Sequence, residues 1–300
     1  MMKQHKLWAS ITLLASLLLL LVGCSTKPAA KNDGITVVSS LNFYGEVAKA
    51  VLGDHGTVTS IITSPNTDPH DFEPTTKTAR TVAKADVVIA NGIGYDGWMQ
   101  KLINANGDDN VTNIRVGEDL MGKKTGANEH IWYNKNTMPK LARHLAKVYA
   151  KRDPKHKAAY QRNAEKYIKS LQPINTKLTQ LKQNKQQQKV AVSEPVFNYA
   201  LSALGYQISD QHFARAIEEG TDPSPSDIKS LQTAITNRKI AFFVQNSQST
   251  DKVIANLVSL AHKHNVPVIK VTETMPHGLN YRQWMLKQYD QLAKIQAAEQ

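Results

Sequence analysis

The sequence has almost no cysteine: among 300 residues there is one, Cys24. A single cysteine excludes disulfides within the chain, so the fold must be stabilised by its hydrophobic core. Motifs of covalent and phosphate chemistry are also absent. There is no Gly-x-Ser-x-Gly nucleophile turn and no phosphate-binding loop. These absences predict that the protein is not an enzyme that works through an activated nucleophile.

One long hydrophobic run is present, and it lies at the beginning. It spans Leu7 to Val22 and follows a short segment with two lysines. A charged start before a short apolar core is typical of a secretory signal, whereas a membrane span needs about 17–25 apolar residues. The run ends in Leu-Val-Gly-Cys, a bacterial lipobox. We therefore predict a signal peptide at 1–23, lipidation of Cys24, a tether at 24–33 and an extracytoplasmic protein anchored to the cell membrane.

The charge is strongly basic, with a formal net charge of +12. Loss of Lys3 and Lys6 with the signal lowers it to +10. A basic balance can indicate nucleic acid, but for an exported protein it favours an anionic envelope or membrane surface. The lysines are scattered, notably along residues 140–190, as on a solvated helix face. We predict no nucleic-acid partner.

Short β-branched strands alternate with amphipathic helices on both sides of the middle of the chain. The predicted strands are 35–38, 58–62, 86–90, 111–116, 189–193, 240–244 and 266–271. Ser39 or Ser40 is a candidate cap for the helix containing Phe43, and Ser224 for a helix beginning at Pro225. Strands alternating with helices predict an α/β fold with mainly parallel sheets.

The middle of the chain predicts one long helix. Asp153 and Pro154 are a favourable start, and apolar residues then recur in three- and four-residue steps from Tyr160 to Leu181. A continuous helix of about 29 residues is about 43 Å long, enough to span two lobes, and Pro173 should kink it. We predict an N-terminal lobe at 34–152, a linking helix at 153–187 and a C-terminal lobe at 188–300.

Four metal-binding side chains follow predicted strands. His70 follows 58–62, His130 follows 111–116, Glu194 follows 189–193 and Glu273 follows 266–271. Ligands of open parallel sheets bind beyond the carboxyl ends of the strands. Neutral imidazole suits zinc and manganese, and carboxylate favours harder ions such as manganese. The four residues form no local ligand motif, so their spacing alone is weak evidence.

The N-terminal half contains motifs of a known family. They are Asp-Pro-His-Asp-Phe-Glu-Pro at 68–74, Ala-Lys-Ala-Asp-Val-Val at 83–88, Asn-Gly-Ile-Gly at 91–94 and Trp98, followed later by Asp-Pro-Ser-Pro at 222–225. Together they resemble the metal-binding cluster of ABC-transporter solute-binding proteins, which includes zinc- and manganese-binding lipoproteins and some surface adhesins. The resemblance covers essentially all of the chain after Cys24. It implies two α/β lobes joined by one long linking helix.

The resemblance also implies a set of metal ligands: His70, His130, Glu194 and Glu273. Glu129 stands where the family usually has proline, and Glu273 replaces an aspartate. Glu194 could instead serve only to begin the helix at Pro195, where a carboxylate interacts favourably with the amide dipoles of the first turn. His277 is the reserve ligand.

Other side chains near these ligands have ordinary structural explanations. Glu218 and Glu219 precede a glycine and are expected in a solvated loop. Tyr95 and Trp98 are expected to pack within their lobe.

The resemblance implies capture of one divalent ion, manganese or zinc, without catalysis. An ABC permease is the expected partner, and a monomer is the expected state. A chelate receptor for haem or a siderophore, or a surface adhesin, are the alternatives. The loop at 117–129 has no histidine-rich stretch, and two histidines with two carboxylates favour manganese, although zinc should bind tightly as well. Binding should weaken in mild acid, because imidazole ligands must be neutral.

Overall fold

The computed structural model describes residues 34–107, 110–183, 189–249 and 251–298. The chain from Gly34 onward forms one compact unit. The predicted signal peptide at 1–23, the tether at 24–33 and the lipidated Cys24 lie outside the described residues. Among the residues described, no helix has both the length and the hydrophobicity to cross a membrane.

The first sheet contains the four strands predicted in the N-terminal half. They are β1 (Ile35–Leu41), β2 (Gly56–Ile62), β3 (Val87–Ala90) and β4 (Thr112–Arg115). The strands are all parallel and lie in the order β2-β1-β3-β4. The central strands are buried on both faces, which explains their continuous runs of valine and isoleucine.

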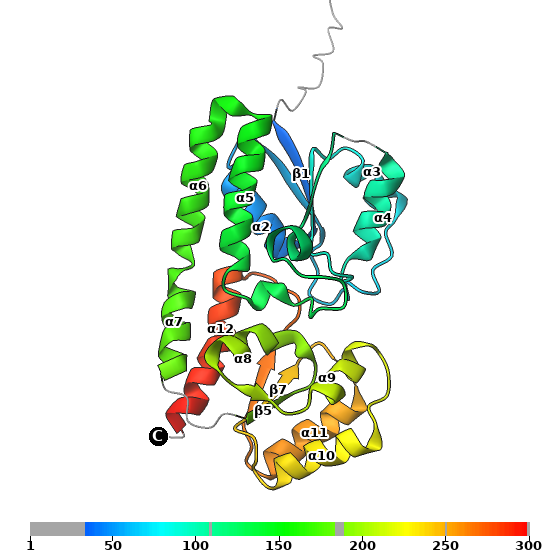
Figure 1. Cartoon of the computed structure of the whole chain (residues 1–300), viewed down its shortest axis with the longest axis vertical. Coiled ribbons are helices and arrows are strands. Elements are labelled where there is room, and N and C mark those ends of the chain that lie inside the picture. The colour runs from blue at the N-terminus through cyan, green and yellow to red at the C-terminus, as the bar shows by residue number, and fades with distance from the viewer. Residues whose placement is uncertain (1–33, 108–109, 184–188, 250, 299–300) are drawn as a thin grey trace, which may run out of the picture. The chain divides into compact units, whose positions relative to one another are not determined.

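The second sheet has the same arrangement. Its strands are β5 (Lys189–Val192), β6 (Gln207–Ile208), β7 (Phe243–Asn246) and β8 (Val268–Val271), and they are parallel in the order β6-β5-β7-β8. The sequence did not predict β6, which has two residues. The predicted strand 240–244 begins three residues later and ends two residues later in the structure, as β7. Two parallel sheets with helices confirm the predicted α/β class (Figure 1).

Helices of the N-terminal half connect the strands of the first sheet or follow its last strand, β4. They are α2 (Asn42–Leu52), α3 (Thr76–Val82), α4 (Gly97–Asn106), the π-helical turn η1 (Val116–Leu120), the 3-10 turn η2 (Ile131–Tyr133) and α5 (Thr137–Arg152). The predicted serine cap of α2 is wrong. Ser39 and Ser40 belong to β1, and the Ser39 hydroxyl donates to the carbonyl of Leu41 instead. The N-cap residue is Leu41, which makes no side-chain cap.

The predicted long helix is present as two helices with a short entry turn. They are η3 (Pro154–His156), α6 (Lys157–Ser170) and α7 (Gln172–Gln183). The helix breaks at Leu171, two residues before Pro173, as expected where proline removes a backbone donor. Figure 1 shows α6 and α7 running along one side of both lobes. The lobe boundaries at 34–152, 153–187 and 188–300 stay predictions, and residues 184–188 lie outside the described residues.

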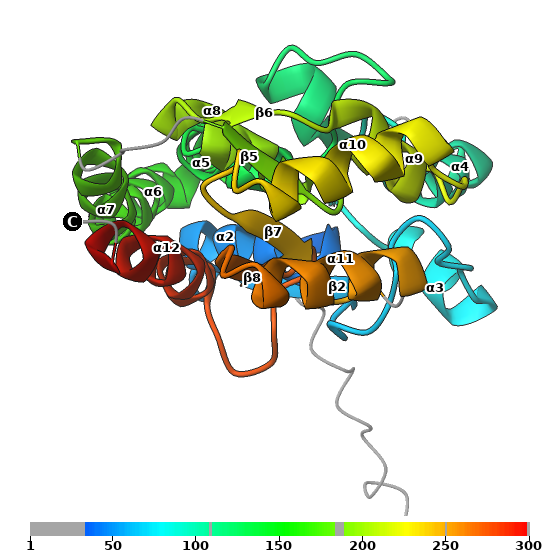
Figure 2. The ribbon, with the colours of Figure 1, turned by 90° about the horizontal axis from the view of Figure 1, so that it is seen from below.

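The C-terminal half surrounds the second sheet with helices. They are η4 (Pro195–Phe197), α8 (Asn198–Leu204), α9 (Gln211–Glu218), α10 (Pro225–Thr236), α11 (Lys252–Lys263) and α12 (Tyr281–Ala298). Ser224 caps α10 as predicted, because its hydroxyl accepts from the Asp227 amide at 3.1 Å. Figure 2 shows α10 and α11 side by side, and α12 runs beside α7 in Figure 1.

The two lobes share a buried aromatic junction. Phe43 of α2 packs against Trp132 of η2 and Trp284 of α12, with ring centroids 5.1 and 5.6 Å apart. All three rings are almost fully buried. The Tyr281 hydroxyl donates to the carbonyl of Trp132 at 2.5 Å. Since aromatic pairs of this kind stabilise beyond the area that they bury, the junction holds η2, which directly follows His130, against α2 and α12.

Candidate metal centre

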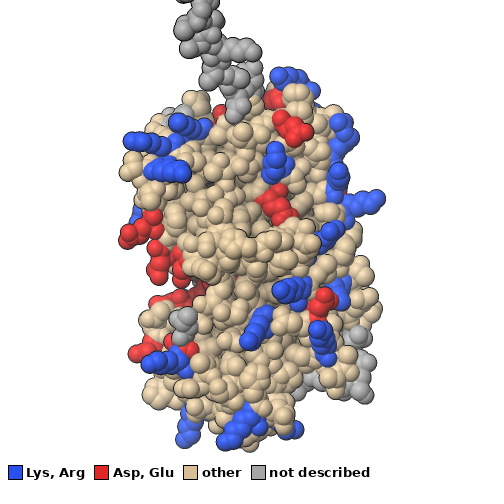
Figure 3. All heavy atoms as spheres, turned by 180° about the vertical axis from the view of Figure 1, so that it is seen from behind, with Lys and Arg blue, Asp and Glu red and all other residues tan. Residues whose placement is uncertain are grey.

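A cleft of about 1250 Å³ lies where the carboxyl ends of the two sheets meet. Its lining includes one histidine and many acidic side chains from loops of both lobes. The titratable residues on which the site depends are Asp68, His70, Glu129, Glu194, Glu218 and Glu273. Figure 3 shows acidic side chains gathered at the left edge, at the boundary between the lobes, whereas lysine and arginine are scattered over both. The cleft is therefore the acidic part of a basic protein, and it is suited to a cation.

His70 reaches the cleft from the loop that follows β2. The Asp68 carboxylate accepts a hydrogen bond from the His70 amide at 2.8 Å, which closes a local turn around Pro69. The imidazole lies edge-on to Tyr95, with ring centroids 4.7 Å apart. Its side chain is 34% exposed. A residue that is packed on one side and open on the other is placed to meet an incoming ion.

His130 lies beneath the cleft and is fully buried. The Asn128 side-chain oxygen accepts from the His130 backbone amide at 2.9 Å and lies 3.1 Å from ring atom Nδ1. An acceptor at Nδ1 places the ring hydrogen there, so Nε2 presents its lone pair. Nε2 has no hydrogen-bond partner among the described residues. Burial, followed by the neighbouring His70, lowers the pKa of His130 to about 3, so this imidazole is a neutral donor at all ordinary pH values.

Glu273 enters from the loop after β8. The Tyr95 hydroxyl donates to its carboxylate oxygen Oε1 at 2.7 Å, and the same oxygen lies 3.9 Å from His130 Nε2 and 4.0 Å from His70 Nε2. Tyr95 is buried as expected, and this bond also makes it a positioning group for Glu273. Burial raises the pKa of Glu273 to about 8, with a further contribution from Asp68.

Glu194 follows β5 and lines the same cleft, where it is 8% exposed. The Asn246 side chain donates to its carboxylate at 2.6 Å. Burial raises the pKa of Glu194. It is the N-cap residue of η4, as the alternative from the sequence has it, but its side chain makes no hydrogen bond to the amides of the turn. Among the described residues, no ion pair within 4.0 Å joins Glu194 to either histidine.

Glu218 is the residue that sequence reasoning placed wrongly. It is the last residue of α9, its side chain is 11% exposed, and its Oε1 lies 3.4 Å from His130 Nε2. Its neighbour Glu219 does behave as expected, with a 52% exposed side chain paired to Arg215. Ala214, one turn earlier on the same face of α9, is buried, but nothing in the sequence marks this face as lining the cleft.

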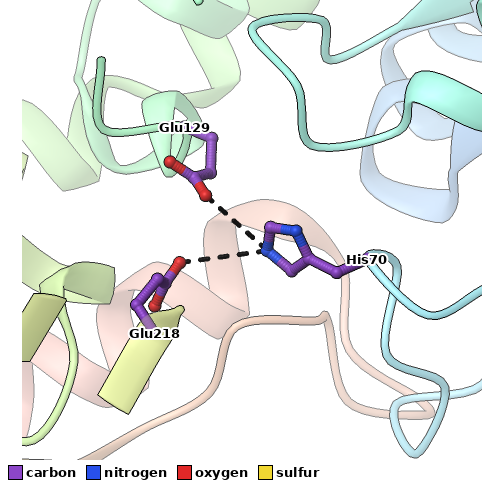
Figure 4. Close-up of side chains that lie close together, drawn as sticks. All are labelled: His70, Glu129 and Glu218. Atoms are coloured by element: carbon purple, nitrogen blue, oxygen red, sulfur yellow. Dashed lines mark ion pairs between the residues drawn. The ribbon is translucent and has the colours of Figure 1, made fainter. Parts of the chain in front are cut away.

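Glu129 adds a third carboxylate beside the histidines. Figure 4 shows the carboxylates of Glu129 and Glu218 both pointing at the His70 ring, from the side opposite to its own loop. The distances from His70 Nε2 are 3.6 Å to Glu129 Oε1 and 3.9 Å to Glu218 Oε1. The ligand atoms of these three residues lie within 4.8 Å of one another. The reserve ligand His277 is exposed and is not among the residues that line the cleft.

The carboxylates repel one another because no cation of the described chain neutralises them. Burial raises the pKa of Glu218 to about 10, and the charges of Glu273, Glu129 and Glu194 raise it further. The one arginine of the cleft lining, Arg215, is engaged by Glu219 at 2.7 Å. A divalent ion would remove this repulsion.

Gln288 positions the segment that carries Glu273, which leads to a first prediction. Its side-chain oxygen accepts from the Thr272 amide at 3.0 Å and from the Tyr133 hydroxyl at 2.8 Å. Gln288→Leu keeps the side-chain size but leaves the Thr272 amide without its acceptor. We expect a loss of about 1–3 kcal/mol in the free energy of unfolding, together with weaker metal binding, measured by urea unfolding and by metal titration.

The matched control for this prediction is Gln291→Leu, one turn further along α12. Gln291 holds Lys270 in the same way, but at an exposed position. We expect a smaller loss of stability and unchanged metal affinity. Equal effects of the two substitutions on metal affinity would contradict the positioning role of Gln288.

Comparison with known proteins identifies the family of the chain. The family described as "Zinc-uptake complex component A periplasmic" (ZnuA) matches residues 37–295. The chain belongs to this family. Among relatives of the ZnuA-family chain, the metal ABC transporter substrate-binding lipoprotein FimA of Streptococcus parasanguinis is 29% identical over 81% of this chain and 83% of its own. The manganese-binding lipoprotein MntA of Halalkalibacterium halodurans is 26% identical, over 68% of this chain and 70% of its own.

A solved structure shows the same fold. The Mn-bound periplasmic metal-binding protein from Candidatus Liberibacter asiaticus superposes with a TM-score of 0.70 at 18% identity, over 87% of this chain and 99% of its own. The α/β architecture expected from the sequence is thus shared with this solved structure.

Proposed function

We propose that this ZnuA-family protein captures one divalent transition-metal ion in the cleft and delivers it to an ABC importer. One observation carries the proposal. The Nε2 atoms of His70 and His130 lie 4.0 and 3.9 Å from Glu273 Oε1, where loops of both lobes meet, and no lysine or arginine of the described chain pairs with this carboxylate. Donors of this type and spacing suit an ion rather than an organic substrate.

The proposed ligands are His70, His130, Glu194 and Glu273. His130 is held by Asn128 and Glu273 by Tyr95, so two of the four are fixed before an ion arrives. Preorganisation of this kind lowers the cost of binding. Glu194 lines the cleft from the second sheet and completes the set when the ion is bound.

The donor chemistry favours manganese over zinc as the physiological cargo. The cleft lining has more carboxylates than imidazoles, and oxygen donors suit the harder ion. Zinc nevertheless lies above manganese in the general order of divalent affinities, so tight binding of zinc in vitro is expected too.

The remaining parts of the proposal concern transport. A carrier site surrounds its ion with protein ligands, whereas a catalytic site keeps an open position for substrate, so we propose capture without catalysis. Lipidation of Cys24 would hold the protein at the outer face of the cell membrane, and the partner would be a membrane permease. Both relatives named above are described as lipoproteins, which supports the anchor.

The test is a calorimetric titration of the metal-stripped protein with Mn²⁺ and with Zn²⁺, followed by competition between the two ions. We expect one ion per chain. Absence of binding for both ions, with binding of a haem or siderophore chelate instead, would overturn the proposal in favour of a chelate receptor.

A further inference from the structure

We propose that Glu218 is a fifth protein ligand of the captured ion and that it shifts the preference of the site from Zn²⁺ towards Mn²⁺. This inference rests on the proposed function. The sequence analysis did not include Glu218 among the four ligands, and the observations that support it come from its placement in the cleft.

The first observation concerns two buried atoms that face each other without forming a hydrogen bond. His130 Nε2 and Glu218 Oε1 are both buried, and neither has a hydrogen-bond partner among the described residues. They face each other at 3.4 Å. With the ring hydrogen on Nδ1 towards Asn128, His130 Nε2 and an ionised Glu218 both present lone pairs, so no hydrogen bond forms between them unless the carboxyl takes up a proton. A cation between the two atoms would satisfy both.

The second observation is the spacing. Donors about 2.1 Å from a metal ion, at angles between octahedral and tetrahedral, lie about 3.0–3.5 Å from each other. The 3.4 Å between His130 Nε2 and Glu218 Oε1 falls within this range. The 3.9 Å between Glu218 Oε1 and His70 Nε2 needs a shift of about half an ångström at the more exposed ring.

The third observation is that no lysine or arginine of the described chain pairs with the buried Glu218 carboxyl. Glu218 ends α9, where the helix dipole disfavours a carboxylate. The nearby Arg215 is paired with Glu219 instead. Glu129, by comparison, is more exposed, at 18%; it lies within 4.0 Å of His70 but not of His130, and its side chain also hydrogen-bonds Glu218 (Figure 4). Glu218 is therefore the ligand, and Glu129 is the alternative that the experiment must exclude.

A fifth donor would affect the two ions differently. Zinc is almost always held by four ligands in a tetrahedron. Manganese favours oxygen donors in an octahedral arrangement. An added carboxylate stabilises the octahedral shell of Mn²⁺ and contributes little to the tetrahedral shell of Zn²⁺. It should therefore change the selectivity between the two ions more than the affinity for Zn²⁺.

The experiment compares Glu218→Gln with Glu219→Gln, the adjacent residue, in titrations of the metal-stripped full chain with Mn²⁺ and Zn²⁺. Glutamine retains the shape and removes the charge. Residues that only orient a metal ligand are worth about 10–100-fold in affinity, so Glu218→Gln should weaken Mn²⁺ at least tenfold, and Zn²⁺ less. Glu219→Gln should leave both affinities unchanged. Thermal melting without metal checks that each variant is folded.

Two further variants, His130→Ala and Glu129→Gln, make the result decisive. If His130→Ala loses Mn²⁺ binding while Glu218→Gln binds like the unchanged protein, the inference on Glu218 is wrong and the proposed function stands. If Glu129→Gln, rather than Glu218→Gln, loses Mn²⁺ affinity, the fifth ligand is Glu129 and the inference is also wrong. If His130→Ala retains full affinity, the proposed function itself fails.

Discussion

Replacing His130 with alanine should raise the dissociation constant for Mn²⁺ by at least about 100-fold. The imidazole is fully buried, its orientation is set by Asn128, and its Nε2 faces the carboxylates of Glu218 and Glu273. Because its pKa is lowered to about 3, it needs no deprotonation before it binds an ion. Alanine removes this nitrogen donor, and no neighbouring side chain replaces it. Calorimetric titration of the metal-stripped variant measures the loss.

The matched control is His277→Ala, which removes an exposed imidazole that follows Glu273 by four residues. We expect no change in affinity, although the sequence makes His277 a reserve ligand. Circular dichroism and thermal melting of both variants without metal separate a lost ligand from a lost fold. A His130→Ala protein that is folded and binds Mn²⁺ within threefold of the unchanged chain would contradict the assignment.

The second large effect concerns protons. In the metal-free cleft the pKa is raised to about 10 for Glu218 and to about 8 for Glu273, in both cases mainly by burial. At pH 7 both carboxyls therefore hold a proton that a bound ion must displace. Binding should release about two protons, and the logarithm of the association constant should rise with pH, with a slope approaching two between about pH 6 and 8. Calorimetry in two buffers of different ionisation enthalpy counts the protons directly.

The same pKa shifts determine how stability changes with pH. An unfolded glutamate has a pKa of about 4.3, so between that value and the raised folded value the metal-free protein binds more protons than its unfolded chain. Its stability should therefore fall as the pH rises through this window. A bound ion removes the repulsion, so the rise in melting temperature on adding Mn²⁺ should be larger at pH 8 than at pH 6. An equal rise in melting temperature at both pH values would show that the ion does not displace protons from these carboxyls.

This behaviour refines an expectation drawn from the sequence. Two imidazole ligands predict weakening in mild acid through their own protonation. Burial moves the titration of His130 far below that range, so the carboxylates become the groups that compete with the ion. The burial of His130 depends on the assembled lobes, so no local sequence pattern around this residue predicts it.

The sheets were predictable because parallel strands buried on both faces have continuous runs of β-branched residues. Seven of the eight strands were recognised, and the exception, β6, has only two residues. The linking helix was predictable from its apolar spacing, and the break within it was predictable from Pro173. The Ser39 or Ser40 cap was wrong because β1 continues to Leu41, and pairing with β2 outweighs the capping preference.

The site was predictable only where a motif marks it. His70 lies within such a motif, and His130 and Glu273 were placed by the resemblance. Glu218 was missed because a Glu-Glu-Gly sequence is typical of a helix end at the surface. What buries Glu218 is the opposite lobe, and a contact between residues so far apart in the sequence has no local signal.

The helices α6 and α7 have a consequence for how quickly the ion leaves. They run along both lobes and are separated from each other only at Leu171. In addition, the Asn128 side chain of the N-terminal lobe donates a hydrogen bond to the Pro195 carbonyl of the C-terminal lobe at 2.7 Å. Wide separation of the lobes would require breaking the aromatic junction, so we expect the ion to leave by local opening at the cleft. His70 is the most exposed of the proposed ligands, at 34%, so its loop is the expected place of that opening. The residence time of the ion would then depend on that loop.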